Sequence, residues 1–357
     1  MKKSPYSFIL AGILLTAAAC EPQEAPSGEP QAPYYLSLDK STIEADGKDT
    51  ATLTIKDANG IVLTDEAHIK NVSLHVVENN TYLTRKTNTF TSIDNGEFTI
   101  EGMYLGVPCE APVVVKVQNR SKYEVFRKKV AIYRNTATWC QNCPSMTAAL
   151  DNVDDYTKER SVLMCFHGDN DYGFTSGGNF LSEHILSTFN LPGYPSAVYS
   201  LSLVPTGRNR NDIMAAVYQE LVEHPASTGI KAESGITGKT LSVNASVKAS
   251  KAGRYDLGIA IVQDNMPGTS NSYEEIYHHV VRNISGNFLY MSTNSFELAA
   301  NEEKSGLQFA DITFDSAAAA DCRVVLFTLV KADSTTGCLI DNIVEFPVGQ
   351  SVDYIYN

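Results

Sequence analysis

Alternating apolar and polar residues fill the first third of this chain. Between about residues 34 and 127, short alternating runs are separated by turn clusters such as Asp57-Ala58-Asn59-Gly60, whose Asn-Gly tip is typical of a hairpin. The runs that we expect to be strands include Tyr35–Leu38, Thr50–Ile55, Val72–Val77 and Val113–Val117. Short strands at this spacing predict an immunoglobulin-like β-sandwich over residues 34–127.

Residues 128–225 change to an alternation of strand-like and helix-like segments. Val130–Tyr133 is a short apolar run, and Ser161–Phe166 is a continuous one, which is typical of a central parallel strand. We expect helices at about Pro144–Tyr156, Gly178–Phe189 and Asn211–Glu223. Parallel strands need helical crossovers, so this order predicts a central thioredoxin-like α/β domain.

Residues 226–357 return to the β pattern. Strands are expected at Leu241–Val247, Tyr255–Val262, Tyr277–Arg282, Leu307–Phe314, Arg323–Lys331 and Leu339–Phe346. A second β-sandwich is the natural interpretation. The fold class predicted for the whole chain is therefore multidomain α+β, with an α/β domain between two β-sandwiches.

The first 20 residues have the pattern of a targeting segment. Lys2 and Lys3 precede the apolar stretch Tyr6–Ala19 of 14 residues, which is too short to span a bilayer at about 20 residues. Small residues then lead into Cys20. This resembles a bacterial lipoprotein signal peptide of residues 1–20, in which Cys20 becomes the lipidated first residue, although Ala17 stands where such signals usually carry Leu. An ordinary secretory signal peptide is the alternative.

Either signal takes the protein out of the cytoplasm, where disulfides are permitted. Residues 21–33 are rich in Pro, Glu, Gln, Ser and Gly, as expected of a disordered tether. Without the two signal lysines, the chain carries 26 basic and 41 acidic residues, a net charge near −15. This charge argues against nucleic acid as a partner. The membrane contact that we expect is the lipid on Cys20.

The residues with the clearest chemistry are Cys140 and Cys143, between Trp139 and Pro144. The pair lies between a predicted strand and a predicted helix start, where unpaired N–H groups and the helix dipole favour a thiolate. Cys140 is then the attacking sulfur, and Cys143 resolves the mixed disulfide. Zinc sites use the same spacing, but the sequence has no second C-x-x-C and no two histidines spaced as H-x3–5-H to complete one. A structural disulfide that never turns over is the other alternative.

His167 follows the apolar run Ser161–Phe166. Ligands gather at the carboxyl ends of strands in open α/β sheets, and Cys140 follows the neighbouring strand. His167 could therefore tune the Cys140 thiolate or exchange protons with it. A metal held by Cys140, Cys143 and His167 is a second interpretation. The third is a loop histidine bonded to a nearby aspartate.

The chain resembles the outer-membrane-protein-28-related lipoproteins of anaerobic Gram-negative bacteria. The motifs that carry this resemblance, over about residues 34 to 347, are Thr138-Trp139-Cys140-x-x-Cys143-Pro144, His167-x-x-Asn170, Gly193-Tyr194-Pro195 and His278-His279-Val280-Val281-Arg282. The resemblance implies a thioredoxin-like domain beside Ig-like domains, anchored at the outer membrane. It supplies no established reaction.

A thioredoxin-like domain also implies a cis proline beside the dithiol, directly before a strand. Pro195 fits that place and Pro192 competes with it. The cis proline would present the backbone of Tyr194 to a substrate and keep metal off the sulfurs. One departure is that Arg134 stands where thioredoxin keeps a buried acid, and arginine cannot act as a base.

Two functions remain open from the sequence. The first is a lipid-anchored thiol–disulfide oxidoreductase acting on the thiols and disulfides of envelope proteins, with Cys140, Cys143, Pro195, Trp139 and His167 at its site. The second is a surface or periplasmic binding or structural lipoprotein whose dithiol is a structural disulfide. Neither needs a cofactor or a metal.

Overall fold

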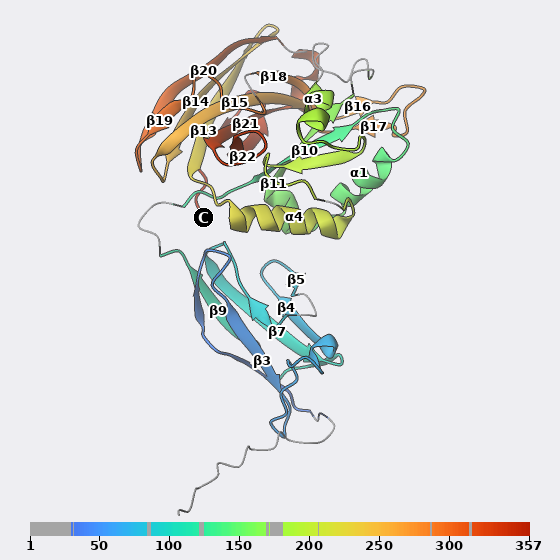
Figure 1. Cartoon of the computed structure of the whole chain (residues 1–357), viewed down its shortest axis with the longest axis vertical. Helices are drawn as coiled ribbons and strands as arrows, with labels where there is room; N and C mark the ends of the chain where they lie inside the picture. Colours follow the sequence, from blue (N-terminus) through green and yellow to red (C-terminus); the bar gives the residue numbers. More distant parts are fainter. Residues whose placement is uncertain are drawn as a thin grey trace, which may run out of the picture.

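The computed structural model contains two bodies connected through residues 125–129 (Figure 1). It describes residues 30, 32–83, 87–120, 125–168, 171, 181–205, 207–285, 288–313 and 316–357. The predicted signal peptide, Cys20 and most of the tether lie outside these residues. Within them, 23 strands and four α-helices form. No helix in this part of the chain has the length and apolar character to cross a membrane.

The first body is a β-sandwich, as the alternating pattern predicts. One sheet has the order β1-β3-β6 and the other β2-β9-β7-β4-β5, with β8 paired to β7. The strands are β1 Tyr35–Leu38, β2 Thr42–Glu44, β3 Ala51–Lys56, β4 Val72–Val76, β5 Thr81–Tyr82, β6 Thr89–Phe90, β7 Gly96–Tyr104, β8 Val107–Pro108 and β9 Val113–Gln118. Alternate residues such as Leu53, Ile55, Leu74 and Val115 are buried between the sheets, because successive side chains in a strand point to opposite faces.

The second body is built on an eight-stranded sheet of order β12-β10-β11-β18-β15-β21-β22, with β19 paired to β15. Its strands are β10 Val130–Thr136, β11 Ser161–His167, β12 Ser196–Tyr199, β15 Gly253–Gln263, β18 Val280–Ser285, β19 Phe296–Leu298, β21 Cys322–Lys331 and β22 Cys338–Pro347. A four-stranded sheet, β20-β14-β13-β23, packs on it through residues such as Leu241, Ile261 and Leu326. This packing agrees in part with the predicted C-terminal β-sandwich.

The remaining strands of the second body are β13 Thr228–Thr237, β14 Thr240–Ala249, β16 Met266–Pro267, β17 Ile276–Tyr277, β20 Glu303–Thr313 and β23 Ser351–Val352. Short strands β16 and β17 pair with each other. They form a separate two-stranded ribbon, and the Tyr277 hydroxyl of β17 donates to Thr138 O, two residues before Cys140.

The prediction of a central thioredoxin-like α/β domain is wrong. The sheet of β12, β10 and β11 continues through β18 into the strands of the C-terminal third, so the body is mostly β. The junction is one parallel pair, Cys165 with Val280, and the Cys165 N–H donates to His279 O at 2.8 Å. If the sheet ended at β11, an apolar strand would be left with a bare edge, which proteins avoid. Strand β18 covers that edge.

The apolar core also joins the two parts of the second body. Tyr133 and Phe166, from β10 and β11, are buried in one cluster with Val262, Phe288 and Phe327 from the C-terminal third. The Phe166 and Phe288 rings stack with centroids 5.7 Å apart. Because these apolar groups are removed from water together, the two parts stabilise each other.

Four α-helices surround the strands β10 to β12: α1 Cys143–Asp151, α2 Asp155–Glu159, α3 Leu181–Thr188 and α4 Arg210–Glu223. The single helix expected at Pro144–Tyr156 is thus two helices. Asp154 separates them, because its side chain caps α2 by accepting from Thr157 N at 2.8 Å. Helix α4 begins with a capping box of Asn209 and Asp212.

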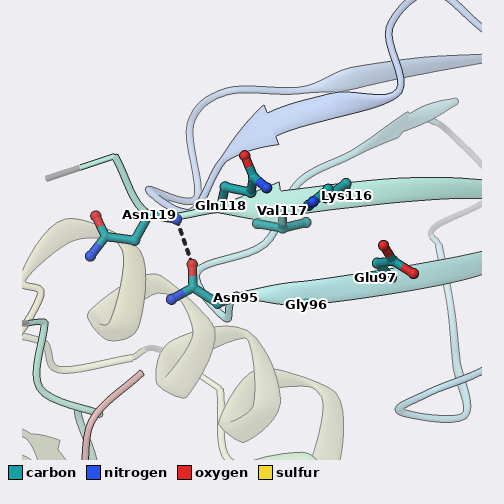
Figure 2. Close-up of a pocket in the computed structure, with 7 residues that line it drawn as sticks. All are labelled: Asn95, Gly96, Glu97, Lys116, Val117, Gln118 and Asn119. Atoms are coloured by element: carbon teal, nitrogen blue, oxygen red, sulfur yellow. Dashed lines mark hydrogen bonds between the residues drawn. The ribbon is translucent and has the colours of Figure 1, made fainter.

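Helix α4 lies on the side of the second body that faces the sandwich (Figure 1). Ile93, from the sandwich, is buried among apolar residues of α1 and α4. Asp94 pairs with the buried Arg160 at 2.7 Å. Nearby, where β7 begins and β9 ends, Asn119 N donates to the side chain of Asn95 (Figure 2). The Asn95 side chain also donates to Asn357 O at 3.0 Å, so the turn before β7 joins the two bodies.

Candidate functional site

Cys140 and Cys143 form a disulfide at the start of α1. Cys140 lies in the turn that leads into the helix, where its N–H donates to Ala137 O at 3.2 Å. Cys143 is the first helical residue. Cys140 is 6% exposed and Cys143 is 1% exposed. Cys140 is therefore the more exposed of two buried residues, and the strand-to-helix position agrees with the sequence pattern.

Two aromatic side chains, Trp139 and Tyr194, lie beside the disulfide. Trp139 is 45% exposed, and its ring meets the ring of Tyr194 edge-on with centroids 5.4 Å apart. Tyr194 packs against the cluster of Ala137 and the two cysteines. The Tyr194 hydroxyl donates to Glu183 Oε1 at 2.7 Å. The Tyr194–Pro195 peptide bond is cis, as predicted, and β12 begins at the next residue.

Gly168 lies below the two aromatic rings. A Cβ atom at this position would be 3.1 Å from the Tyr194 hydroxyl oxygen and 3.2 Å from the indole of Trp139. Such contacts are closer than ordinary van der Waals packing, so a larger residue would push the rings apart. The absence of a side chain at residue 168 lets Trp139 and Tyr194 meet over the end of β11.

His167 is bonded to an aspartate, which is one of the interpretations that the sequence left open. Its Nδ1 is 2.5 Å from Asp171 Oδ2. The same carboxylate accepts from the backbone N–H of Thr138 at 2.7 Å and from the Thr138 hydroxyl. The ring of His167 meets that of Tyr277 edge-on at 5.5 Å. His167 therefore reaches the cysteine turn through Asp171 and Thr138.

Burial and hydrogen bonding fix the charges of this pair. Burial lowers the pKa of His167, against the opposing effect of its bond to Asp171. For Asp171, burial acts to raise the pKa, but hydrogen bonds from His167 and Thr138 outweigh it, and the pKa is lowered. At neutral pH the pair is thus a neutral imidazole whose Nδ1–H donates to a carboxylate.

Arg134 lies under the first turn of α1. Its Nη2 donates to Cys143 O at 3.1 Å and to Thr147 Oγ1 at 2.6 Å. Glu274 Oε1 is 3.9 Å from the same nitrogen and accepts from Thr147 at 2.9 Å. A carboxylate from the C-terminal third thus lies within ion-pair distance of Arg134.

Two other reactive side chains of the second body, Cys165 and His279, are held by contacts within the fold. Cys165 is a buried thiol beside Arg134, and burial raises its pKa, as expected from its apolar run. The backbone N–H of His279 donates to Asp264 at 2.8 Å, and its Nδ1 is 2.8 Å from Arg323 Nη2. Burial, followed by the charge of Arg323, lowers the pKa of His279 to about 4.

Sequence reasoning brought Cys140, Cys143, Trp139 and Pro195 to one place, and the structure agrees. It missed Glu274 and Tyr277 as contacts of this site. Asp171 had a usable signal, since it follows His167 by four residues. Glu274 had no signal in the sequence that connects it with the cysteines, because it lies in a loop 131 residues beyond Cys143. In the part of the chain that the structure describes, no group of three His, Cys, Asp or Glu side chains is arranged to hold a metal.

A cavity of about 1010 Å³ lies between the sandwich and helices α2 and α4. Its lining includes Tyr82, Tyr156, Tyr218 and Tyr356. The cysteine turn contributes nothing to this lining, so the cavity is separate from the disulfide.

Comparison with known proteins assigns no family. No protein-family model matches the sequence, and no curated protein matches it. Among solved structures, HBP35 of Porphyromonas gingivalis is 18% identical over 63% of this chain and 76% of that chain, with a TM-score of 0.49. A protein of Agrobacterium tumefaciens is 16% identical over 65% and 98% of the two chains, with a TM-score of 0.42. The resemblance to outer-membrane-protein-28-related lipoproteins stays a prediction.

Proposed function

We propose that this chain is a lipid-anchored envelope protein that exchanges thiols and disulfides with other envelope proteins. The observation that supports this most directly is the Cys140–Cys143 disulfide at the start of α1, with the more exposed of the two residues, Cys140, next to exposed Trp139. Unpaired N–H groups at a helix start favour a thiolate. Cys140 lies in the turn directly before this helix start and is the more exposed of the two residues, so we assign it as the nucleophile of the reduced protein.

The reaction has two steps. The Cys140 thiolate attacks a partner disulfide, which forms a Cys140–partner bond and releases one partner thiolate. Cys143, after losing its proton, attacks the Cys140 sulfur, re-forms the Cys140–Cys143 disulfide and releases the second partner thiolate. The partner gains two electrons and this chain loses two. With the chain oxidised at the start, the same steps run in reverse.

The neighbouring residues have supporting roles in this proposal. Trp139 offers an apolar contact for the partner chain, because almost half of its surface is exposed. Pro195 holds Tyr194 against the cysteine cluster. His167 acts as a positioning residue, since its Nδ1 bonds to Asp171, which in turn accepts from Thr138.

The test is the reaction of the reduced protein with a disulfide dye. We expect exchange by the wild type, none at this site in Cys140→Ser, and a trapped mixed disulfide on Cys140 in Cys143→Ala. Cys109→Ser is the matched control, because burial raises the pKa of that thiol to about 11 and it should contribute little exchange. A wild type that reacts no faster than Cys140→Ser would refute the proposal.

The alternative is a structural disulfide, which the burial of both sulfurs favours. Alkylation of cells after acid quenching separates the two functions. An exchanging protein gives a mixture of reduced and oxidised Cys140, and Cys143→Ala captures envelope partners on Cys140. A structural disulfide stays fully oxidised and captures none.

The anchor is tested separately. If Cys20 carries lipid, Cys20→Ser should move the protein from the membrane fraction to the soluble fraction, since a lipid chain contributes about 0.8 kcal/mol of membrane affinity per buried CH₂. Cys109→Ser should leave the distribution unchanged. A Cys20→Ser variant that stays with the membrane would contradict the lipid anchor but not the exchange chemistry.

A further inference from the structure

A segment of the C-terminal third forms one wall of the disulfide site. The backbone N–H of Tyr273 donates to Thr138 O at 3.1 Å, and the Tyr277 hydroxyl donates to the same oxygen at 3.4 Å. Thr138 lies two residues before Cys140. The segment Tyr273–Tyr277 therefore holds the turn that carries the attacking sulfur, and Glu274 lies within it.

Glu274 is connected to Cys143 through two polar side chains. Arg134 Nη2 donates both to Cys143 O and to Thr147 Oγ1, and the Thr147 hydroxyl donates to Glu274 Oε1. The Arg134 and Glu274 side chains are 6% and 16% exposed. Charges this well shielded from water act on their neighbours more strongly than surface charges do.

The two charges have opposite effects on the reduced site. A guanidinium is always protonated in proteins, so Arg134 stabilises a thiolate in the first turn of α1. The carboxylate of Glu274, 3.9 Å from Arg134, offsets that effect. The balance between these two side chains, from different parts of the chain, then decides how easily the disulfide is reduced.

We propose that Glu274 is a positioning residue that sets the reduction potential of the Cys140–Cys143 pair by opposing the charge of Arg134. This inference rests on the proposed exchange function. It makes the C-terminal third part of the redox site, because removal of one carboxylate there changes the electron affinity of a disulfide 131 residues earlier in the sequence.

The experiment is redox equilibration with glutathione. Two glutathione thiols give up two electrons and two protons and become one glutathione disulfide, while the Cys140–Cys143 bond breaks, Cys143 takes up one proton, Cys140 remains a thiolate and the other proton goes to the buffer. Glu274→Gln keeps the shape and the hydrogen-bond acceptor for Thr147 but removes the charge. We expect the equilibrium to move at least tenfold toward the dithiol, which is about 30 mV for a two-electron couple.

Glu275→Gln is the matched control. Glu275 is the next residue, it is exposed, and removing its charge changes the net charge by the same amount. The redox equilibrium constant of Glu275→Gln with glutathione should stay within twofold of the wild-type value. Thermal unfolding and Trp139 fluorescence establish that Glu274→Gln and Glu275→Gln are folded. A third variant, Arg134→Gln, should move the redox equilibrium in the opposite direction, toward the disulfide.

The outcomes separate this inference from the proposed function. If the wild type equilibrates and Glu274→Gln does not move the equilibrium, or moves it no more than Glu275→Gln, the role of Glu274 is refuted and the exchange function stands. If the wild-type disulfide does not equilibrate with glutathione at all, both are refuted. A shift confined to Glu274→Gln supports the role.

Discussion

Asp171 accepts both hydrogen bonds that Thr138 can donate, one from its backbone N–H at 2.7 Å and one from its hydroxyl. Thr138 begins the cysteine turn, and Asp171 follows the end of β11 by four residues. These two hydrogen bonds therefore connect the cysteine turn to the segment that follows β11. Because Asp171 also holds His167, the geometry around the disulfide depends on one carboxylate.

Replacing Asp171 with Asn should destabilise the fold by about 2 kcal/mol, since hydrogen bonds to a buried charged group each contribute about 1.5–3 kcal/mol and Asn keeps part of them. Urea unfolding followed by Trp139 fluorescence measures the loss. Asp151→Asn, at an exposed position on α1, is the control and should change stability by less than about 0.5 kcal/mol. Equal losses of stability in Asp171→Asn and Asp151→Asn would contradict the role of Asp171 in holding the cysteine turn.

His167 predicts a pH dependence of stability. Its pKa is lowered by burial, so on acidification the unfolded chain takes up the proton first, near pH 6.5. The unfolded state binds more protons in this window, and the free energy of unfolding falls as the pH drops below 6.5 toward the lower folded pKa. Above pH 7.5 the contribution is constant.

The variant His167→Gln lacks this titration. We expect the stability difference between wild type and variant to be flat above pH 7.5. Below pH 6.5 it should shrink by about 1.4 kcal/mol per pH unit until the folded imidazole is protonated. Urea unfolding between pH 5 and 8.5 provides the measurement. A difference that grows on acidification would mean that His167 is charged in the fold.

The sequence allowed local structure to be predicted well, because local patterns determine it. The period-two runs correspond to strands such as β3 and β14, and the expected helix Asn211–Glu223 is α4 within one residue. Alternation does not determine which strand lies beside which. The single pair Cys165 with Val280 joins two predicted domains into one sheet, and neither run shows that partnership.

The site was predictable only where its residues are neighbours in sequence or belong to a known motif. The cysteine pair and Pro195 were found in this way. Glu274 and Tyr277 reach the site because β16 and β17 form a ribbon beside β18, and a loop position in a polar segment gives no sign of this. Arg134 was noticed, but its partner could not be found without the fold.

The shared sheet predicts how fragments behave. The core of the first sandwich draws only on residues between Tyr34 and Val117, so a fragment of residues 34–120 should unfold cooperatively on its own. A fragment of residues 128–225 exposes Tyr133, Phe166 and the edge of β11, so it should aggregate or remain unfolded. Circular dichroism in urea and size-exclusion chromatography distinguish the two. A monomeric, cooperatively folded 128–225 fragment would show that the predicted domain is self-sufficient.

The two cysteines should differ in reactivity once reduced. Cys140 is the more exposed of the two residues and lies in the turn before the helix start, and a thiol there whose pKa falls by one unit has about ten times more thiolate below that pKa. Limited alkylation at pH 6 followed by peptide mass spectrometry should thus modify Cys140 at least about ten times faster than Cys143. Urea-unfolded protein is the control, in which the two rates should converge. Equal rates in the folded protein would remove the assignment of Cys140 as nucleophile.

Stacking between Phe166 and Phe288 offers the most direct test that the central and C-terminal parts form one core. The rings belong to β11 and to the segment after β18, and both side chains are buried. Each change to Ala should cost about 3–5 kcal/mol, since it leaves a cavity. The double variant should lose less stability than the two single variants lose together, with a coupling of about 0.5–1.5 kcal/mol for an aromatic pair.

Val114→Ala, at an exposed position in β9 of the first sandwich, is the control that should show no coupling to either ring. Strict additivity of the Phe166 and Phe288 changes would mean that the two parts are stabilised independently, which would contradict the shared core.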